Sequence, residues 1–244
     1  MTLLPAQHPL ITRYAEIREA TAARYGPTSQ AVVFLLYEEL VSLRAVLAQD
    51  RDCPVAARRV RELAADIQSR FDDSGLRDTA RPHHVLLCAD PPLIAYDRDV
   101  FDRQYLAALR ATGRSARTIR SAAEAFAELS TAVSYIYAID DLGSLRVWPE
   151  PFTLAELVFG RALDRPVPGP RIVHPMLVPE RLRVRAAGEM VLLGTPGSPV
   201  VVGNLKSGHF RPPPQSGAVF RSVIREVFAI TDDADIDVFT MPAS

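Results

Sequence analysis

The sequence predicts an α+β protein in which a helical N-terminal region packs on a C-terminal antiparallel β-sheet with one covering helix. Up to about residue 130, apolar residues recur mostly at spacings of three and four, as in helices that bury one face. From Thr131 the pattern changes to alternation among many β-forming residues, which is typical of strands. We therefore expect a helical region over residues 1–130 and a sheet region over residues 131–244.

The composition narrows the classes of function. Of the 244 residues, 48% are hydrophobic and 23% are charged, and the net charge is −1, as in an ordinary globular protein. The chain has no excess of positive charge that would attract nucleic acid or an anionic membrane, so we expect neither as a partner. The N-terminus lacks a signal-peptide pattern, and no apolar run approaches the roughly twenty residues of a membrane span. We therefore expect a cytoplasmic protein.

Spacing and stop signals place several helices before residue 130. Gly26 and Pro27 end the first helix, and Thr28 or Ser29 can cap the second. A strand-like segment, His84–Cys88, interrupts the helical pattern. The expected helices are Leu10–Arg24, Ser29–Ala48, a segment from Asp52 to Phe71, Asp99–Ala111 and Arg117–Ser130.

Alternation and turn residues place most strands after residue 131. Asp140, Asp141 and Gly143 form a turn signal between two runs of β-forming residues, which predicts a hairpin. The expected elements are hairpin strands Val133–Ile139 and Ser144–Trp148, a capped helix Leu154–Leu163, strands Arg171–Val178, Leu182–Leu193 and Pro199–Gly203, a helix capped by Ser216, and a last strand Ile236–Thr240.

Polar residues gather in the segment Lys206–Pro212, which we call the KSGHFRP loop and which follows a predicted strand. Loops held by a rigid strand often carry binding and catalytic groups. Lys206 is the only lysine among 28 basic residues; the preference for arginine, with abundant Ala and Pro, is typical of a high-GC bacterial genome. The retained lysine indicates either a need for a compact ammonium group or chance. The candidate residues of this loop are Lys206, Ser207, Gly208, His209 and Arg211.

Two further residues, His174 and Glu189, lie on neighbouring predicted strands of the same sheet. Two imidazoles, a carboxylate and two cations in one place would suit general acid–base chemistry on an anionic molecule. The predicted catalytic residues are His209, His174 and Glu189, and the predicted substrate-binding residues are Lys206, Ser207, Gly208 and Arg211.

A structural interpretation of the same residues stays open. His209 could hold the loop through a backbone carbonyl, Gly208 could supply a positive φ, and Arg211 could pair with Glu189. A Ser-His-Asp hydrolase is disfavoured, because Ser207 lies only two residues from His209 and in no Gly-x-Ser-x-Gly elbow.

Metal binding has little support in the pattern. His174, His209 and Glu189 are sufficient in number for a catalytic zinc site, but no pair among them has a diagnostic spacing. The group His83, His84 and Cys88 lacks further ligands at usable spacing. We therefore expect no metal and no cofactor.

A series of residues in the last third of the chain follows the predicted hairpin and ends in a Ser-Gly-His signature; they are His174, Gly188, Ser207, Gly208, His209 and Pro212. In this order they resemble the C-terminal half of plant IQ-motif calmodulin-binding proteins, and related segments of bacterial effector and toxin-like proteins. The chain departs from that pattern at Pro175 and Met176, where the family has serines, and at Phe210, where it has tyrosine. The sequence shows no basic IQ helix, so the resemblance does not imply calmodulin binding.

These observations predict a cytoplasmic, cofactor-independent enzyme acting on an anionic small molecule, nucleotide-like or an activated acyl compound, within bacterial biosynthesis. The alternative is a non-catalytic protein-interaction module or a toxin-like effector domain, in which the KSGHFRP loop is a structural corner. The sequence leaves open whether the chain forms a homo-oligomer.

Overall fold

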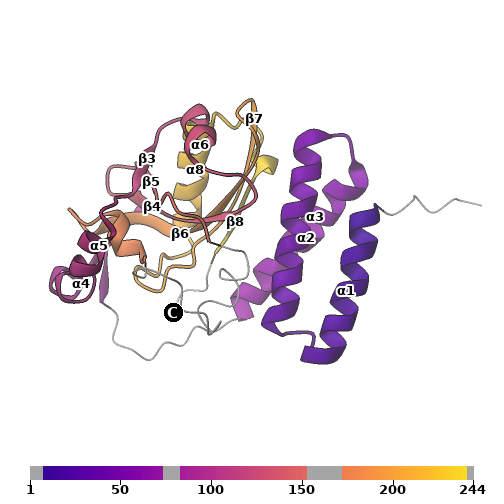
Figure 1. The fold of residues 1–244 in the computed structure, drawn as a ribbon, viewed down its shortest axis with the longest axis horizontal. Helices are drawn as coiled ribbons and strands as arrows, with labels where there is room; N and C mark the ends of the chain where they lie inside the picture. Colours follow the sequence, from indigo (N-terminus) through magenta and orange to yellow (C-terminus); the bar gives the residue numbers. More distant parts are fainter. Residues whose placement is uncertain (1–7, 74–82, 153–171, 241–244) are drawn as a thin grey trace, which may run out of the picture.

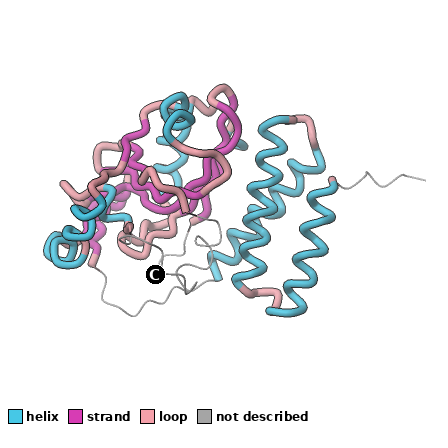
Figure 2. Tube along the Cα trace, viewed as in Figure 1, coloured by secondary structure: helices cyan, strands magenta, loops and turns pink. Residues whose placement is uncertain are grey.

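A computed structural model describes residues 8–73, 83–152 and 172–240. Three helices form a layer at one end of the molecule, and the sheet with its own helices forms the other part (Figure 1, Figure 2). The predicted α+β class is confirmed: the long helices come first and most strands follow. No described helix is long and apolar enough to cross a membrane.

The helical layer consists of α1 (Pro9–Tyr25), α2 (Gln30–Gln49) and α3 (Pro54–Asp73), close to the predicted bounds. Gly26, at φ +91°, ends α1 in a conformation that L side chains rarely adopt. At the centre of the layer, the fully buried carboxylate of Glu39 is paired with Arg18 of α1 and with Arg59 of α3, at 2.7 Å from Arg59 Nε. One buried anion thus joins all three helices, and its two partners offset its desolvation.

Through α2 and α3, the layer packs on one face of the sheet, at the last three described strands, including an end strand. The guanidinium of Arg44 binds both carboxylate oxygens of Asp237 on β8 (Ile236–Phe239), each at 2.7 Å. The Gln68 side-chain amide both donates to and accepts from the backbone of Thr240, at 3.0 Å in each direction. Buried apolar residues of α2 and α3 complete the contact with Val191, Leu193, Val200, Val202 and Phe239.

Eight strands among the described residues form one sheet, with the path β1-β2-β6-β4-β5-β3 and with β7 between β6 and β8. All pairs are antiparallel except β7 with β8, which is parallel. The other strands are β1 (His84–Ala89), β2 (Pro92–Tyr96), β3 (Arg117–Ile119), β4 (Ser134–Asp140), β5 (Leu145–Val147), β6 (Arg183–Thr195) and β7 (Ser198–Asn204).

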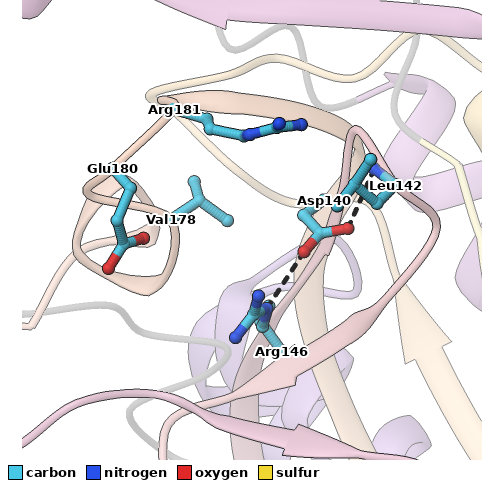
Figure 3. A pocket seen from close by; sticks show the side chains of 6 residues that line it. All are labelled: Asp140, Leu142, Arg146, Val178, Glu180 and Arg181. Carbon is cyan, nitrogen blue, oxygen red and sulfur yellow. Dashed lines mark hydrogen bonds and ion pairs between the residues drawn. The ribbon is translucent and has the colours of Figure 1, made fainter.

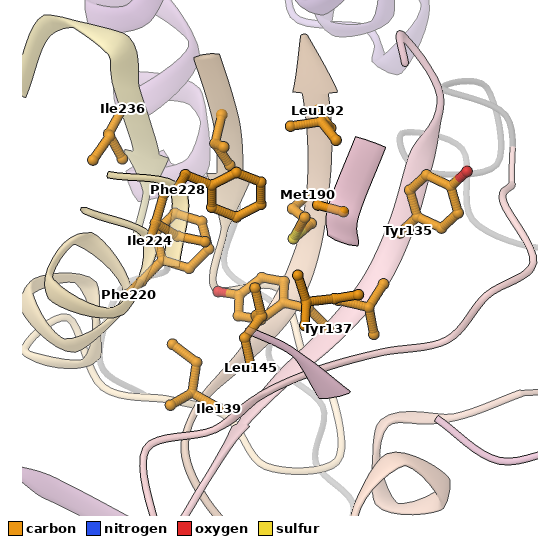
Figure 4. Packing of buried hydrophobic residues seen from close by; sticks show 14 of the residues in the cluster. Tyr135, Tyr137, Ile139, Leu145, Met190, Leu192, Phe220, Ile224, Phe228 and Ile236 are labelled. Atoms are coloured by element: carbon orange, nitrogen blue, oxygen red, sulfur yellow. The ribbon is translucent and has the colours of Figure 1, made fainter. Parts of the chain in front are cut away.

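Helix α8 (Ser216–Phe228) covers the sheet, as predicted, and lies on the face opposite the helical layer. Its Phe220, Ile224 and Phe228 pack on Tyr137, Met190 and other buried sheet residues (Figure 4). Ser216 was predicted as the cap of this helix but is its first residue, after the N-cap Gln215, and its hydroxyl donates to the Arg185 carbonyl at 2.6 Å.

The structure differs from the predicted elements in four places. The division at residue 130 falls within the sheet region, because β1, β2 and β3 all precede it and pair into the sheet. Arg117–Ile119 is a strand paired with β5, and only Ala122–Glu128 (α6) is helical. The predicted helix Asp99–Ala111 is two helices, α4 (Arg98–Gln104) and α5 (Leu106–Thr112), which meet at Tyr105. The predicted strand Arg171–Val178 instead contains the 3₁₀ helix η2 (His174–Leu177), and the predicted helix Leu154–Leu163 lies outside the described residues.

Candidate functional site

The strand that precedes the KSGHFRP loop leaves the sheet beside Gly188. β4 occupies one edge of β6 from Val184 to Val191, so β2 and β7 share the other edge. Where β7 ends, the Asn204 side-chain oxygen accepts from the backbone N–H groups of Glu189, at 3.2 Å, and of Lys206, at 2.9 Å. Asn204 therefore fixes the point at which the chain turns away from β6.

Gly188 makes this crossing sterically feasible. A Cβ atom at this position would lie 1.9 Å from the Asn204 carbonyl oxygen, far inside van der Waals contact. The same oxygen accepts from the Tyr137 hydroxyl at 2.9 Å. The Ala-Ala-Gly segment of β6 thus has a packing explanation, which requires no catalytic role.

His174 is buried, with 7% of its surface exposed, and is bonded to the backbone of the same strand. Its Nε2 lies 3.0 Å from the Gly188 carbonyl oxygen and must donate, because a carbonyl only accepts. Burial lowers the pKa of the imidazole to about 4, although the bond to Gly188 acts in the opposite direction. His174 is therefore neutral near pH 7 and braces η2 against β6.

The KSGHFRP loop contains a tight turn. The Arg211 N–H donates to the Ser207 carbonyl at 2.7 Å, and the Phe210 N–H donates to the Ser207 hydroxyl at 3.3 Å. Positive φ, +46°, falls on Arg211; Gly208 is exposed, and an added Cβ there would meet nothing within 4 Å. The strained residue is thus a predicted anion-binding arginine, and strain at a non-glycine residue is a feature of functional loops.

This turn presents His209, half-buried, to aromatic residues that the sequence reasoning missed. Its Nε2 lies 3.1 Å from the Tyr105 hydroxyl oxygen, and its ring centroid lies 5.9 Å from that of Tyr96 on β2. Phe210 is fully buried, and its ring centroid lies 5.8 Å from that of Tyr96. Burial, followed by Tyr105, raises the pKa of Tyr96.

A histidine of β1 and the arginine of the loop lie on the same side of the molecule. Burial lowers the pKa of His84, and the positive charge of Arg211 lowers it further, followed by that of His83. Arg211 is thus close enough to act electrostatically on β1. We call Tyr96, Tyr105, His209, His84 and Arg211 the Tyr105–His209 site.

Glu189 and Lys206 belong to different surroundings. The Glu189 side chain is half-buried as a whole, but its Oε2 is sealed from solvent and has no hydrogen-bond partner among the described residues. Burial raises the pKa of the carboxyl group to about 7, and the nearby Lys206 charge and Asn204 limit the rise. The charge of Glu189 also acts on the pKa of Tyr37 in α2 and of Tyr137 in β4. We call Glu189, Lys206, Asn204, Tyr37 and Tyr137 the Glu189 cluster.

The predicted site residues thus fall into three places. His209 and Arg211 contribute to the Tyr105–His209 site, with Ser207 and Gly208 forming the turn between them and β7. Glu189 and Lys206 lie in the Glu189 cluster, and His174 is bonded to the Gly188 backbone. Among the described residues, no group of three or more His, Cys, Asp or Glu is placed to hold a metal ion.

A pocket of about 220 Å³ lies elsewhere, between the β4–β5 turn and the turn at Glu180 (Figure 3). Its polar walls are largely paired internally: Asp140 accepts from the N–H of Leu142 at 3.0 Å and from Arg146 Nε at 3.0 Å. None of the predicted site residues lines it; the lining residues are Asp140, Leu142, Arg146, Val178, Glu180 and Arg181.

Comparison of the chain with protein-family models, curated proteins and solved structures finds no significant match. The resemblance of the Ser-Gly-His segment to IQ-motif proteins therefore stays a prediction, and any function rests on the geometry of the sites.

Proposed function

We propose that the chain is a cytoplasmic, cofactor-independent enzyme that acts by acid–base chemistry on an anionic small molecule at the Tyr105–His209 site. The observation that carries the proposal is the contact of 3.1 Å between His209 Nε2 and the Tyr105 hydroxyl, on a half-buried loop. A proton can pass between a phenol and an imidazole that are hydrogen-bonded to each other, and imidazole exchanges protons near neutral pH.

Charge at this site favours an anionic substrate. Arg211 supplies a planar fork suited to a carboxylate or a phosphate, and its positive charge extends to His84. The aromatic rings of Tyr96 and Tyr105 beside His209 offer flat apolar surface, as a nucleobase would require. We therefore propose a nucleotide-like molecule or an activated acyl compound as substrate.

Binding of two probes tests the proposal: ATP represents nucleotides and acetyl coenzyme A represents activated acyl compounds. We expect at least one to shift the NMR signals of the His209 ring, and Arg211→Gln to weaken that binding about tenfold or more, since a charged hydrogen bond is worth about 1.5–3 kcal/mol. Arg58→Gln makes the same replacement at an exposed arginine of α3; it is the control and should bind as the wild type does. Equal binding by wild type and Arg211→Gln would contradict the assignment.

One observation favours the alternative, a protein-interaction module. The end strand β1 exposes three consecutive apolar side chains, Val85 at 61% and Leu86 and Leu87 at 50% each. An extended segment of a partner protein could add to such an edge through backbone hydrogen bonds. If the chain is an interaction module, Leu86→Lys should abolish partner binding and Tyr105→Phe should leave it intact. If the chain is an enzyme, Tyr105→Phe should reduce substrate turnover and Leu86→Lys should leave turnover intact.

A further inference from the structure

The Glu189 carboxyl group lies where the helical layer meets the sheet, and the proposed chemistry does not use it. Its neighbours on β6, Ala187 and Val191, point to the same face and pack into the clusters beneath η2 and α2. Asn204 links the position to α2, because its amide nitrogen lies 3.5 Å from the Tyr37 hydroxyl. Glu189 thus lies at the junction of α2, β6 and the KSGHFRP loop.

The groups that face this carboxyl group come from every element around it. Within the described parts of the chain, Lys206 of the loop provides the only positive charge among them, and the hydroxyls of Tyr37 on α2 and Tyr137 on β4 remain neutral. Asp237 of β8 adds negative charge near Tyr37, but is itself paired with Arg44. His174 donates to the carbonyl of the adjacent Gly188 and is neutral near pH 7.

The two protonation states of Glu189 fit this junction differently. A neutral carboxylic acid loses little when Oε2 is sealed, whereas a carboxylate there lacks a donor on one oxygen within the part of the chain that the structure describes. Lys206 offsets part of this cost, and the remainder can be relieved if water reaches Oε2. Separation of α2 from β6 and β7 would admit such water, because Tyr37 of α2 lies beside Asn204 at this position.

We propose that Glu189 is a proton-operated switch of the junction: its ionisation loosens the packing of α2 against the sheet, and with it the start of the KSGHFRP loop. Protonation closes the junction. The inference is independent of the proposed function, because it concerns a different group of residues and requires no substrate.

Hydrogen exchange tests the switch on the full chain, between pH 5.5 and 8.5, with rates corrected for the intrinsic pH dependence of exchange. In the wild type, we expect protection of the α2 amides to fall by about tenfold or more as pH rises. The reason is that each unit of difference between the Glu189 pKa in the closed and open states changes the equilibrium between these states about tenfold. Glu189→Gln should remove this change. Glu226→Gln makes the same replacement at an exposed position on α8 and should retain it.

Lys206→Met provides a second test, in which the Glu189 carboxyl group is kept. Loss of the ammonium charge should move the midpoint of the α2 transition to higher pH, because Lys206 favours the carboxylate. A pH-independent wild type, an unchanged transition in Glu189→Gln, or a midpoint that falls in Lys206→Met would each overturn the proposal.

Discussion

The two histidines predicted for one active site occupy opposite kinds of environment. His174 is sealed, neutral and bonded to a backbone carbonyl at 3.0 Å, whereas His209 is half-buried and contacts a tyrosine side chain at 3.1 Å. A bond to backbone stabilises a fold wherever it occurs, but a contact between two titratable side chains on a loop can exchange protons. The comparison indicates that His174 supports the junction from which the KSGHFRP loop starts, and it makes His209 the better candidate of the two for the proposed acid–base chemistry.

The largest effect should come from the crossing of β7 over Gly188. Gly188→Ala would place a methyl group 1.9 Å from the Asn204 carbonyl oxygen, and neither backbone can yield without breaking the pairing of β6. We expect a loss of about 3 kcal/mol or more in the free energy of unfolding, measured in urea. Gly208→Ala, with open space around it, should stay within about 0.5 kcal/mol. Equal losses at both positions would contradict the packing account.

The next effect is the pH dependence of stability at His174. Its pKa of about 4 in the folded state lies below the usual 6.5, so its contribution is complete above pH 6.5 and is lost as pH falls to 4. We therefore expect His174→Gln, whose amide can still donate to Gly188, to remove an acid-dependent loss on the order of 3 kcal/mol. Urea unfolding of both proteins between pH 4 and 7.5 checks this, with His83→Gln as control. Parallel curves for wild type and His174→Gln would rule the assignment out.

A smaller effect on stability is expected for the contact between Tyr105 and His209. Tyr105→Phe removes one hydroxyl from a half-buried position, so the free energy of unfolding should change by about 1 kcal/mol or less. The NMR titration curve of His209, in contrast, should shift because its Nε2 loses its partner. Leu142→Ala, an exposed position in the distant β4–β5 turn, should leave that curve unchanged. A His209 titration that is the same in Tyr105→Phe and wild type would mean that the contact has no role in proton exchange.

Elements with local signals were predictable from the sequence. The spacing of apolar residues predicted α2; Val32, Leu36, Leu40 and Leu43 are buried as expected, and Leu47 is half-buried. The strand Ile236–Phe239 was predicted almost to the residue. β3 was missed because it has only three residues and depends on pairing with β5, a contact that no local pattern records.

Which residues form the Tyr105–His209 site depends on contacts between residues that are far apart in the chain. His209 and Arg211 were recognised because they cluster in the chain, but Tyr105 lies 104 residues earlier, inside what appeared as one continuous helix. The interruption between α4 and α5 at Tyr105 is seen in the structure, and the sequence analysis found no pattern that marks it. His174 and Glu189 were grouped with His209 because neighbouring strands were expected to converge, and that expectation did not account for the 3₁₀ helix at His174.

The difference in role between the two histidines is tested most directly by the free energies of unfolding of His174→Ala and His209→Ala, measured side by side in urea at pH 7. The account predicts a loss of about 2–3 kcal/mol for His174→Ala, from a cavity and an unmade hydrogen bond, and of about 1 kcal/mol or less for His209→Ala. A loss at His209 equal to or greater than that at His174 would show that the KSGHFRP loop is a structural corner, and would contradict a catalytic role for His209.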